Sequence, residues 1–170
     1  SPDGRKLALT LSRDGNLDIY TLELATQSLS RVTSDDAIDT EPEWSRDGQS
    51  LYFTSDRAGN AQIYRVALDG SHKADRVTFT NGYNARPRLS PDGKELAMVT
   101  LDRGGYRIAV MDLDTRNLRI LTNASQDESP SFAPNGALLI YATRERSRGS
   151  LAIVSSDGRF QQRLSSDQGD

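Results

Sequence analysis

The sequence predicts an all-β fold: a β-propeller of four-stranded antiparallel blades, present as a partial propeller of about four blades. Three observations lead to this prediction. A unit of about 44 residues recurs along the 170-residue chain, each unit holds short apolar runs with a period near two, and Asp-Gly or Asn-Gly turns separate the runs. Four short strands in a repeat of this length are typical of a propeller blade, whereas solenoids have shorter repeats and sandwiches have none.

The repeat is visible first in a turn motif. Its glycines stand 44, 45 and 43 positions apart, at Gly4, Gly48, Gly93 and Gly136. Fifteen residues after each glycine comes a branched aliphatic residue, at Ile19, Ile63, Ile108 and Leu151. Because the register holds far from the turn, the whole unit is repeated.

Each unit is expected to contain four strands. The first strands are predicted at 7–10, 51–54, 96–99 and 139–142, the second at 19–20, 63–64, 108–110 and 151–153, and the third at 31–32, 76–77, 119–121 and 163–164. A fourth strand precedes the next turn and carries a proline, at 42–44, 87–89 and 130–132. Since proline cannot donate to a ladder, this strand should be a sheet edge that lines the central channel. Trp44, Leu89 and Phe132 would then pack between blades.

The chain as a whole, 1–170, is interpreted as one propeller segment. The approximate repeats are 1–35, 36–80, 81–124 and 125–170, and the first lacks an innermost strand. We therefore expect the chain to be a piece of a larger propeller.

Composition argues against several classes of protein. The chain has no Cys and a formal net charge of -3, so thiolate chemistry and binding to nucleic acid by bulk charge are not expected. No apolar run approaches the roughly 20 residues of a membrane-spanning helix. On these grounds, both the cytoplasm and the periplasm remain open.

Motifs for catalysis are also absent, and no catalytic residue, metal ligand or cofactor is predicted. The segment 14–18 imitates the opening of a calcium loop, but Ile19 stands where that loop needs glycine. His72, the one histidine, is expected in an exposed turn. The recurrent Arg-Val-Thr and Ser-Asp-Arg elements are interpreted as structural because they occupy the same place in successive units.

Several stretches resemble the TolB propeller family. The generic repeat is carried by 41–48, 61–64, 68–70 and 76–78, and the more specific stretches are 40–42, 53–56, 127–131, 133–136 and 156–160. The resemblance implies a periplasmic protein with an N-terminal α/β domain and a six-bladed propeller, of which this chain would be the C-terminal part. It also implies a non-enzymatic role in the Tol-Pal system, which supports outer-membrane integrity and constriction during cell division. The implied partners are the lipoprotein Pal, other Tol proteins and the translocation segments of colicins.

The same resemblance implies a partner-binding site at one mouth of the channel. In the family, this mouth is built by loops that join the outermost strand of one blade to the innermost strand of the next. The corresponding residues are Ile38, Asp39, Thr40, Glu41, Tyr83, Asn84, Ala85, Arg86, Asp127, Glu128 and Ser129. The pair Thr40-Glu41 matches the family best, whereas 83–86 departs from it in charge.

An acidic cluster overlaps these loops, comprising Asp35, Asp36, Asp39, Glu41 and Glu43, with Asp127 and Glu128 expected near the same rim. It is expected to accept charge-assisted hydrogen bonds from a partner, with two alternatives: a calcium site, or solvation alone. Two other functions stay open. One is a regulatory propeller of a peptidase similar to prolyl oligopeptidase or tricorn, and the other is a propeller that binds a small ligand or sugar.

Overall fold

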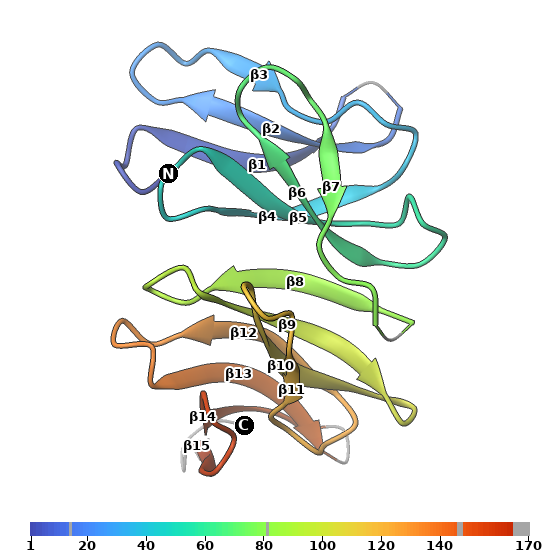
Figure 1. Ribbon diagram of the computed structural model, residues 1–170, viewed down its shortest axis with the longest axis vertical. Coiled ribbons are helices and arrows are strands. Elements are labelled where there is room, and N and C mark those ends of the chain that lie inside the picture. The colour runs from blue at the N-terminus through green and yellow to red at the C-terminus, as the bar shows by residue number, and fades with distance from the viewer. Residues whose placement is uncertain (14, 81, 146–147, 165–170) are drawn as a thin grey trace. The chain divides into compact units, whose positions relative to one another are not determined.

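A computed structural model describes residues 1–13, 15–80, 82–145 and 148–164, and in these residues the only regular elements are strands (Figure 1). The strands are β1 (Lys6–Ser12), β2 (Leu17–Glu23), β3 (Leu29–Arg31), β4 (Asp39–Trp44), β5 (Ser50–Ser55), β6 (Gln62–Ala67), β7 (Ala74–Arg76), β8 (Asn84–Leu89), β9 (Glu95–Asp102), β10 (Gly105–Asp112), β11 (Leu118–Ile120), β12 (Asp127–Phe132), β13 (Leu138–Glu145), β14 (Arg148–Ser155) and β15 (Gln161–Leu164). The all-β prediction is confirmed.

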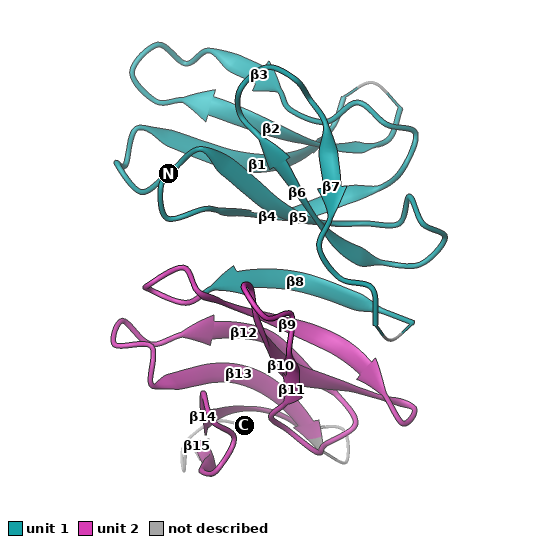
Figure 2. Ribbon diagram, in the orientation of Figure 1, with its two compact units in different colours: residues 1–89 teal, residues 90–170 magenta. Residues whose placement is uncertain are grey.

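The chain forms two compact units, Ser1–Leu89 and Ser90–Asp170, which are described separately (Figure 2). Unit 1 contains the sheets β1-β2-β3 and β4-β5-β6-β7, together with β8. Unit 2 contains the meander β9-β10-β11 and the sheet β12-β13-β14-β15. The paired strands within each unit are antiparallel and consecutive in the chain, as in the blades of a propeller. The proline-bearing strands β4 and β12 lie at the edges of their sheets, as predicted.

The recurrent turn motif is held by one set of hydrogen bonds. In the second repeat, Ser45 Oγ donates to Asp47 Oδ1 at 2.5 Å and accepts the Ser50 N–H at 2.9 Å. Asp47 also accepts the Gln49 N–H at 3.0 Å, and Gly48 closes the turn with φ +69°. A side chain at this positive φ would be strained, which explains the invariant place of glycine in the repeat. The recurrent turns at Asp3 and Asp92 use the same serine–aspartate pair, and so does the turn between β14 and β15 at Asp157.

A second repeated device involves the threonine after the third strand. Thr33, Thr78 and Thr122 each accept, through Oγ1, the N–H of the branched aliphatic residue in the second strand, at 2.9–3.0 Å. The preceding arginine adds a bond in two units, where Arg31 and Arg76 donate from Nε to the threonine carbonyl oxygen. The structural interpretation of Arg-Val-Thr is therefore confirmed.

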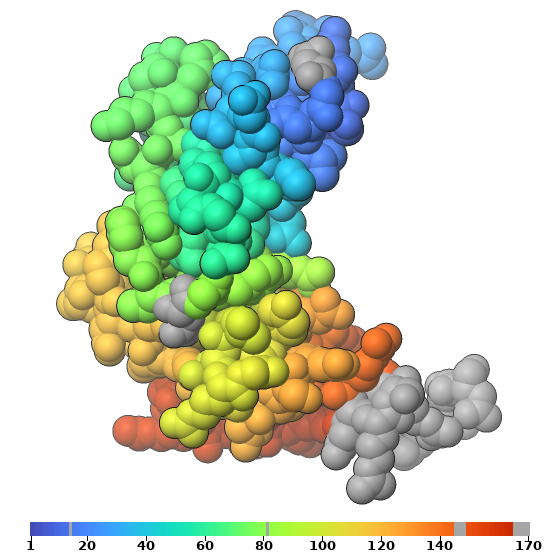
Figure 3. All heavy atoms as spheres, turned by 90° about the vertical axis from the view of Figure 1, so that its right-hand side faces the viewer, coloured from blue at the N-terminus to red at the C-terminus, as the bar shows by residue number. Residues whose placement is uncertain are grey.

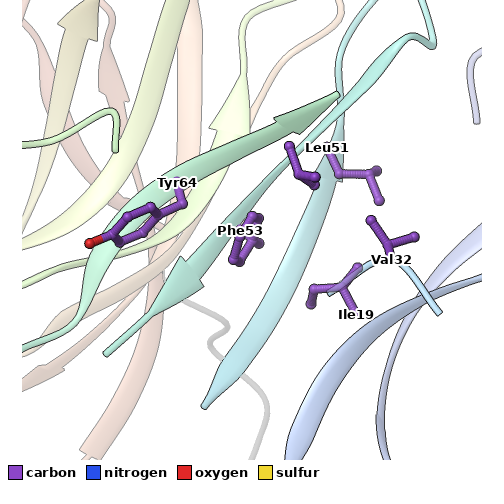
Figure 4. Close-up of a cluster of buried hydrophobic side chains, with 6 residues drawn as sticks. Ile19, Val32, Leu51, Phe53 and Tyr64 are labelled. Carbon is purple, nitrogen blue, oxygen red and sulfur yellow. The ribbon is translucent and has the colours of Figure 1, made fainter. Parts of the chain in front are cut away.

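The core of unit 1 lies between its two sheets (Figure 4). Ile19 and Val32 come from the first repeat, and they pack in one cluster with Leu51 and Phe53 of the second. Trp44 packs against this cluster from β4, so its predicted place between two blades is confirmed. Each fully buried side chain of this kind stabilises the fold by about 1.5–3 kcal/mol. In the space-filling view, side chains close the gaps that separate the ribbons (Figure 3).

Candidate functional site

The predicted partner-binding residues lie at the beginnings of three equivalent strands, β4, β8 and β12. The third residue of each strand has a positive φ, with values of 58° at Glu41, 57° at Arg86 and 56° at Ser129, and each is followed by proline. The pairing register shifts at this point in both β4 and β12. A bulge of this kind bends the strand and re-aims its side chains. The first residues of these strands are thus set apart from the regular ladder that follows.

Burial divides the predicted residues into three groups. Ile38 is 49% exposed, and Glu128 and Ser129 are also exposed. Thr40, Glu41, Tyr83 and Arg86 are half-buried. The buried group consists of Asp39, Asn84, Ala85 and Asp127. Asp39 and Asp127 are completely buried, so the expectation that they form part of an exposed acidic rim is wrong.

Asp39 instead holds the fold of the second repeat together. Its carboxylate accepts two hydrogen bonds from Arg57 Nη2, at 2.8 and 3.0 Å, and is completely buried. The Arg57 guanidinium lies over two rings, with Cζ 5.4 Å from the Phe53 centroid and 4.9 Å from the Tyr64 centroid. The Ser-Asp-Arg turn is therefore structural, as predicted. Its Asp56 fixes the loop by accepting the Ile38 N–H at 2.8 Å.

Glu41 joins the first two predicted loops, which both lie in unit 1. Its Oε1 accepts Arg86 Nε at 2.9 Å, and its Oε2 accepts the Arg86 N–H at 3.1 Å. Thr54 donates its hydroxyl to the same Oε2 at 2.9 Å and accepts the Arg86 N–H at 3.0 Å. We call Glu41, Thr54 and Arg86 the loop lock. The positive charge at 83–86 that departs from the family pattern is thus the complement of Glu41.

A buried polar network anchors the second loop to β6. Asn84 donates from Nδ2 to Gln62 Oε1 at 3.1 Å and to the Thr80 carbonyl oxygen at 2.6 Å. Thr78 donates its hydroxyl to the same Gln62 oxygen at 2.7 Å. Because buried polar groups are costly when unpaired, this network defines one position for the start of β8.

The acidic residues do not converge on one point. Asp39 and Glu41 face separate arginines, Asp35 accepts the Ala37 N–H at 3.0 Å, and burial raises the pKa of Glu43 despite nearby Arg88 and Arg46. Within the described residues, no three His, Cys, Asp or Glu side chains are grouped to hold a metal ion. The geometry therefore offers no support for the calcium alternative.

His72 lies outside the predicted loops. It is exposed in its turn, as predicted, and its Nδ1 lies 2.9 Å from the Val32 carbonyl oxygen.

In the part of the chain that the structure describes, no helix is long and apolar enough to cross a membrane.

A family model described as the TolB beta propeller domain matches residues 1–170. The chain belongs to the TolB β-propeller family. Among curated relatives, it is 52% identical over 94 residues to the Tol-Pal system protein TolB of Pseudomonas aeruginosa, covering 54% of this chain and 22% of that protein. It is 48% identical over 109 residues to the TolB of Nitrosospira multiformis, covering 63% of this chain and 25% of that protein.

A solved structure supports the same assignment. The crystal structure of TolB from Acinetobacter baumannii has a TM-score of 0.92 and 47% identity, and the match covers 100% of this chain and 43% of that one. This TolB-family chain therefore spans less than half of that TolB chain and about a quarter of the curated relatives. An oligogalacturonate lyase and a puromycin-hydrolyzing peptidase also match, both with a TM-score of 0.74, at 17% and 20% identity. At such identities, the likeness shows the propeller fold alone.

Proposed function

We propose that this TolB-family chain belongs to a non-enzymatic, periplasmic protein-binding propeller of the Tol-Pal system, with Pal as its main partner. In this role it supports outer-membrane integrity and constriction during cell division. Other Tol proteins and colicin translocation segments would use the same surface. The observation that carries the proposal is the loop lock, which fixes two of the predicted loops of a TolB-family chain against each other.

The loop lock favours binding because it reduces the conformational freedom that a partner has to overcome. A loop that is already ordered loses less entropy on association, so more of its contact energy appears as affinity. Loops held on a rigid β scaffold are also where binding residues concentrate. The buried Asp39–Arg57 pair and the Asn84 network also keep these loops ordered, and neither contacts the partner in this proposal.

The residues proposed to contact the partner are those of the predicted set that reach solvent. Ile38 supplies an apolar side chain that is 49% exposed, and Glu128 and Ser129 supply acceptors. A partner can use an apolar side chain such as Ile38 as the anchor of a binding hot spot. Glu41 and Arg86 act as positioning residues.

The test is calorimetric binding of the soluble domain of Pal to the full-length protein. Ile38→Asp and Glu128→Lys should each weaken binding about tenfold or more, because a truncated or reversed hot-spot contact costs about 1.4 kcal/mol or more. Asp75→Ala is the matched control, because its side chain is exposed on the outermost strand β7 of the second sheet, away from β4. Unchanged affinity in both rim variants would place the Pal site elsewhere.

Glu41→Gln tests the role of the loop lock separately. The amide keeps the shape of the carboxylate but loses its charge, so the bonds to Arg86 weaken while Ile38 stays in place. We expect a loss of affinity of about three- to tenfold with a faster exchange of backbone amides in 83–86. A loss of affinity without faster exchange would make Glu41 a contact residue.

A further inference from the structure

Unit 2 contains a polar hollow of about 950 Å³. One side is the segment that leads into β12, residues 123–126, and the other is the face of β13, β14 and β15. The strand residues that line it are Tyr141, Thr143, Arg144, Ala152, Gln161 and Arg163. We call this space the unit 2 hollow.

A buried carboxylate lies on the same face of the sheet. Asp127 is 0% exposed, and neither of its oxygens has a hydrogen-bond partner within the part of the chain that the structure describes. It stands opposite Thr143 in the ladder, so the two side chains share the face on which Tyr141 also lies. Asp127 is close enough for its charge to raise the pKa of the Tyr141 hydroxyl, an effect that adds to burial and opposes the hydrogen bond from Gln161.

The second repeat shows which side chain binds the equivalent buried carboxylate in the same protein. By ladder register, Asp39, Phe53 and Tyr64 correspond to Asp127, Tyr141 and Ala152. In unit 1, a guanidinium from Arg57 lies over the two rings and binds Asp39 through two hydrogen bonds.

In unit 2, the corresponding parts differ at two places. The ring of Tyr64 is replaced by the methyl group of Ala152, which leaves open space. Two residues after Thr143, where Arg57 would stand, the sequence has Glu145, and Arg146 lies outside the described residues. Unit 2 therefore keeps the carboxylate and one ring of the arrangement, and no described residue donates a hydrogen bond to that carboxylate.

We propose that the unit 2 hollow binds the guanidinium group of an arginine side chain presented by a peptide or protein partner. Asp127 accepts both hydrogen bonds, and the Tyr141 ring supports the planar cation, as Asp39 and Phe53 do for Arg57. Arg144 and Arg163 line the same hollow, so a carboxylate next to the arginine complements them. The preferred ligand is thus an arginine beside an acidic residue.

The inference does not rest on the proposed function, because Ile38 and Glu128, the residues changed in the rim variants, do not line the unit 2 hollow. Loss of Pal binding in the rim variants tests that function. The ligand experiments below test this site.

The experiment measures binding of acetyl-Arg-Glu-amide to the full-length protein by NMR titration. Acetyl-citrulline-Glu-amide is the matched ligand, because its urea group has nearly the shape of guanidinium without the charge. We expect the arginine ligand to bind at least tenfold more tightly than the citrulline ligand. Asp127→Asn should remove this preference, whereas Asp114→Asn, which changes an exposed carboxylate in the turn between β10 and β11, should leave it within twofold.

A second variant distinguishes loss of the binding site from loss of the folded structure. Ala152→Tyr places a ring where Tyr64 stands in unit 1 and fills part of the unit 2 hollow, so it should abolish binding without lowering the melting temperature. Equal binding of the two ligands, no binding of the arginine ligand, or unchanged binding in Asp127→Asn would each overturn the proposal.

Discussion

Replacing two equivalent aspartates by asparagine should have different effects on stability. Asp39 and Asp127 occupy the same ladder position and are both 0% exposed. Asp39 is bound by Arg57 at 2.8 and 3.0 Å, whereas Asp127 has no hydrogen-bond partner among the described residues. The same substitution therefore breaks a buried ion pair in one case and changes an unpaired buried group in the other.

The magnitudes follow from burial. Removing one partner of a buried ion pair costs about 3–5 kcal/mol, and asparagine recovers part of this cost because its amide oxygen still accepts from Arg57. We expect Asp39→Asn to lower the free energy of unfolding by about 2–4 kcal/mol. Asp127→Asn should change it by no more than about 1 kcal/mol, since both the carboxyl group and the amide are buried polar groups without a hydrogen-bond partner.

Urea unfolding followed by circular dichroism measures both variants. Trp44, the one tryptophan, packs against the core cluster of unit 1, so its fluorescence reports the effect of Asp39→Asn locally. An equal loss of stability in the two variants would refute the reasoning, because it would mean that the ion pair contributes nothing specific to the second repeat.

Three further predictions concern the repeated devices. Thr78→Val should lower the free energy of unfolding by about 1–3 kcal/mol, because the buried Ile63 N–H loses its acceptor. Hydrogen exchange at the Ile63 amide should become faster, and an unchanged exchange rate would contradict this prediction. Hydrogen bonds from the Ser90 hydroxyl and the Lys94 N–H lower the pKa of Asp92 below 3.8, so its contribution to stability is present above pH 3.8 and is lost as pH falls through the lower folded value. Asp92→Asn should therefore make the free energy of unfolding depend less on pH at acid pH. An unchanged pH dependence in this range would refute the prediction. Gly48→Ala should lower the free energy of unfolding, measured by thermal unfolding, by about 1–2 kcal/mol, because alanine is strained at the φ of +69°. An unchanged free energy of unfolding would show that the turn adopts another backbone conformation.

The strands were predictable because their signal is local and repeated. The period-two pattern around Ile19 and Ile63 and the turn glycines recur with the same spacing, so each copy supports the others. The proline in β4 correctly indicated an edge strand, since a missing N–H has the same consequence in any fold.

The site was less predictable because burial depends on pairs that are distant in sequence. Asp39 and Glu41 are two positions apart and both acidic, yet one is buried against Arg57 and the other binds Arg86, 45 residues away. Sequence reasoning missed Arg57, Thr54 and Arg86 as supports for the loops. A usable signal was present for Arg57 alone, in the Ser-Asp-Arg turn that follows β5.

The unit 2 hollow could not be predicted from the sequence for a related reason. It arises where one repeat has Ala152 in place of the ring that Tyr64 provides in another. Such a difference becomes meaningful only when the ladder register shows that the two residues are equivalent and that Asp127 stays unpaired. A repeat protein therefore allows one blade to serve as the reference for another.

Hydrogen exchange of the full-length protein with and without the soluble domain of Pal tests the central claim most directly. The claim is that the loops entering β4 and β8 in unit 1 and the loop entering β12 in unit 2 each contact Pal. We predict that Pal slows exchange at 38–41, 83–86 and 126–129 and leaves the outer strands β3, β7 and β11 unchanged. Slower exchange on the outer strands, with the three loops unaffected, would contradict it.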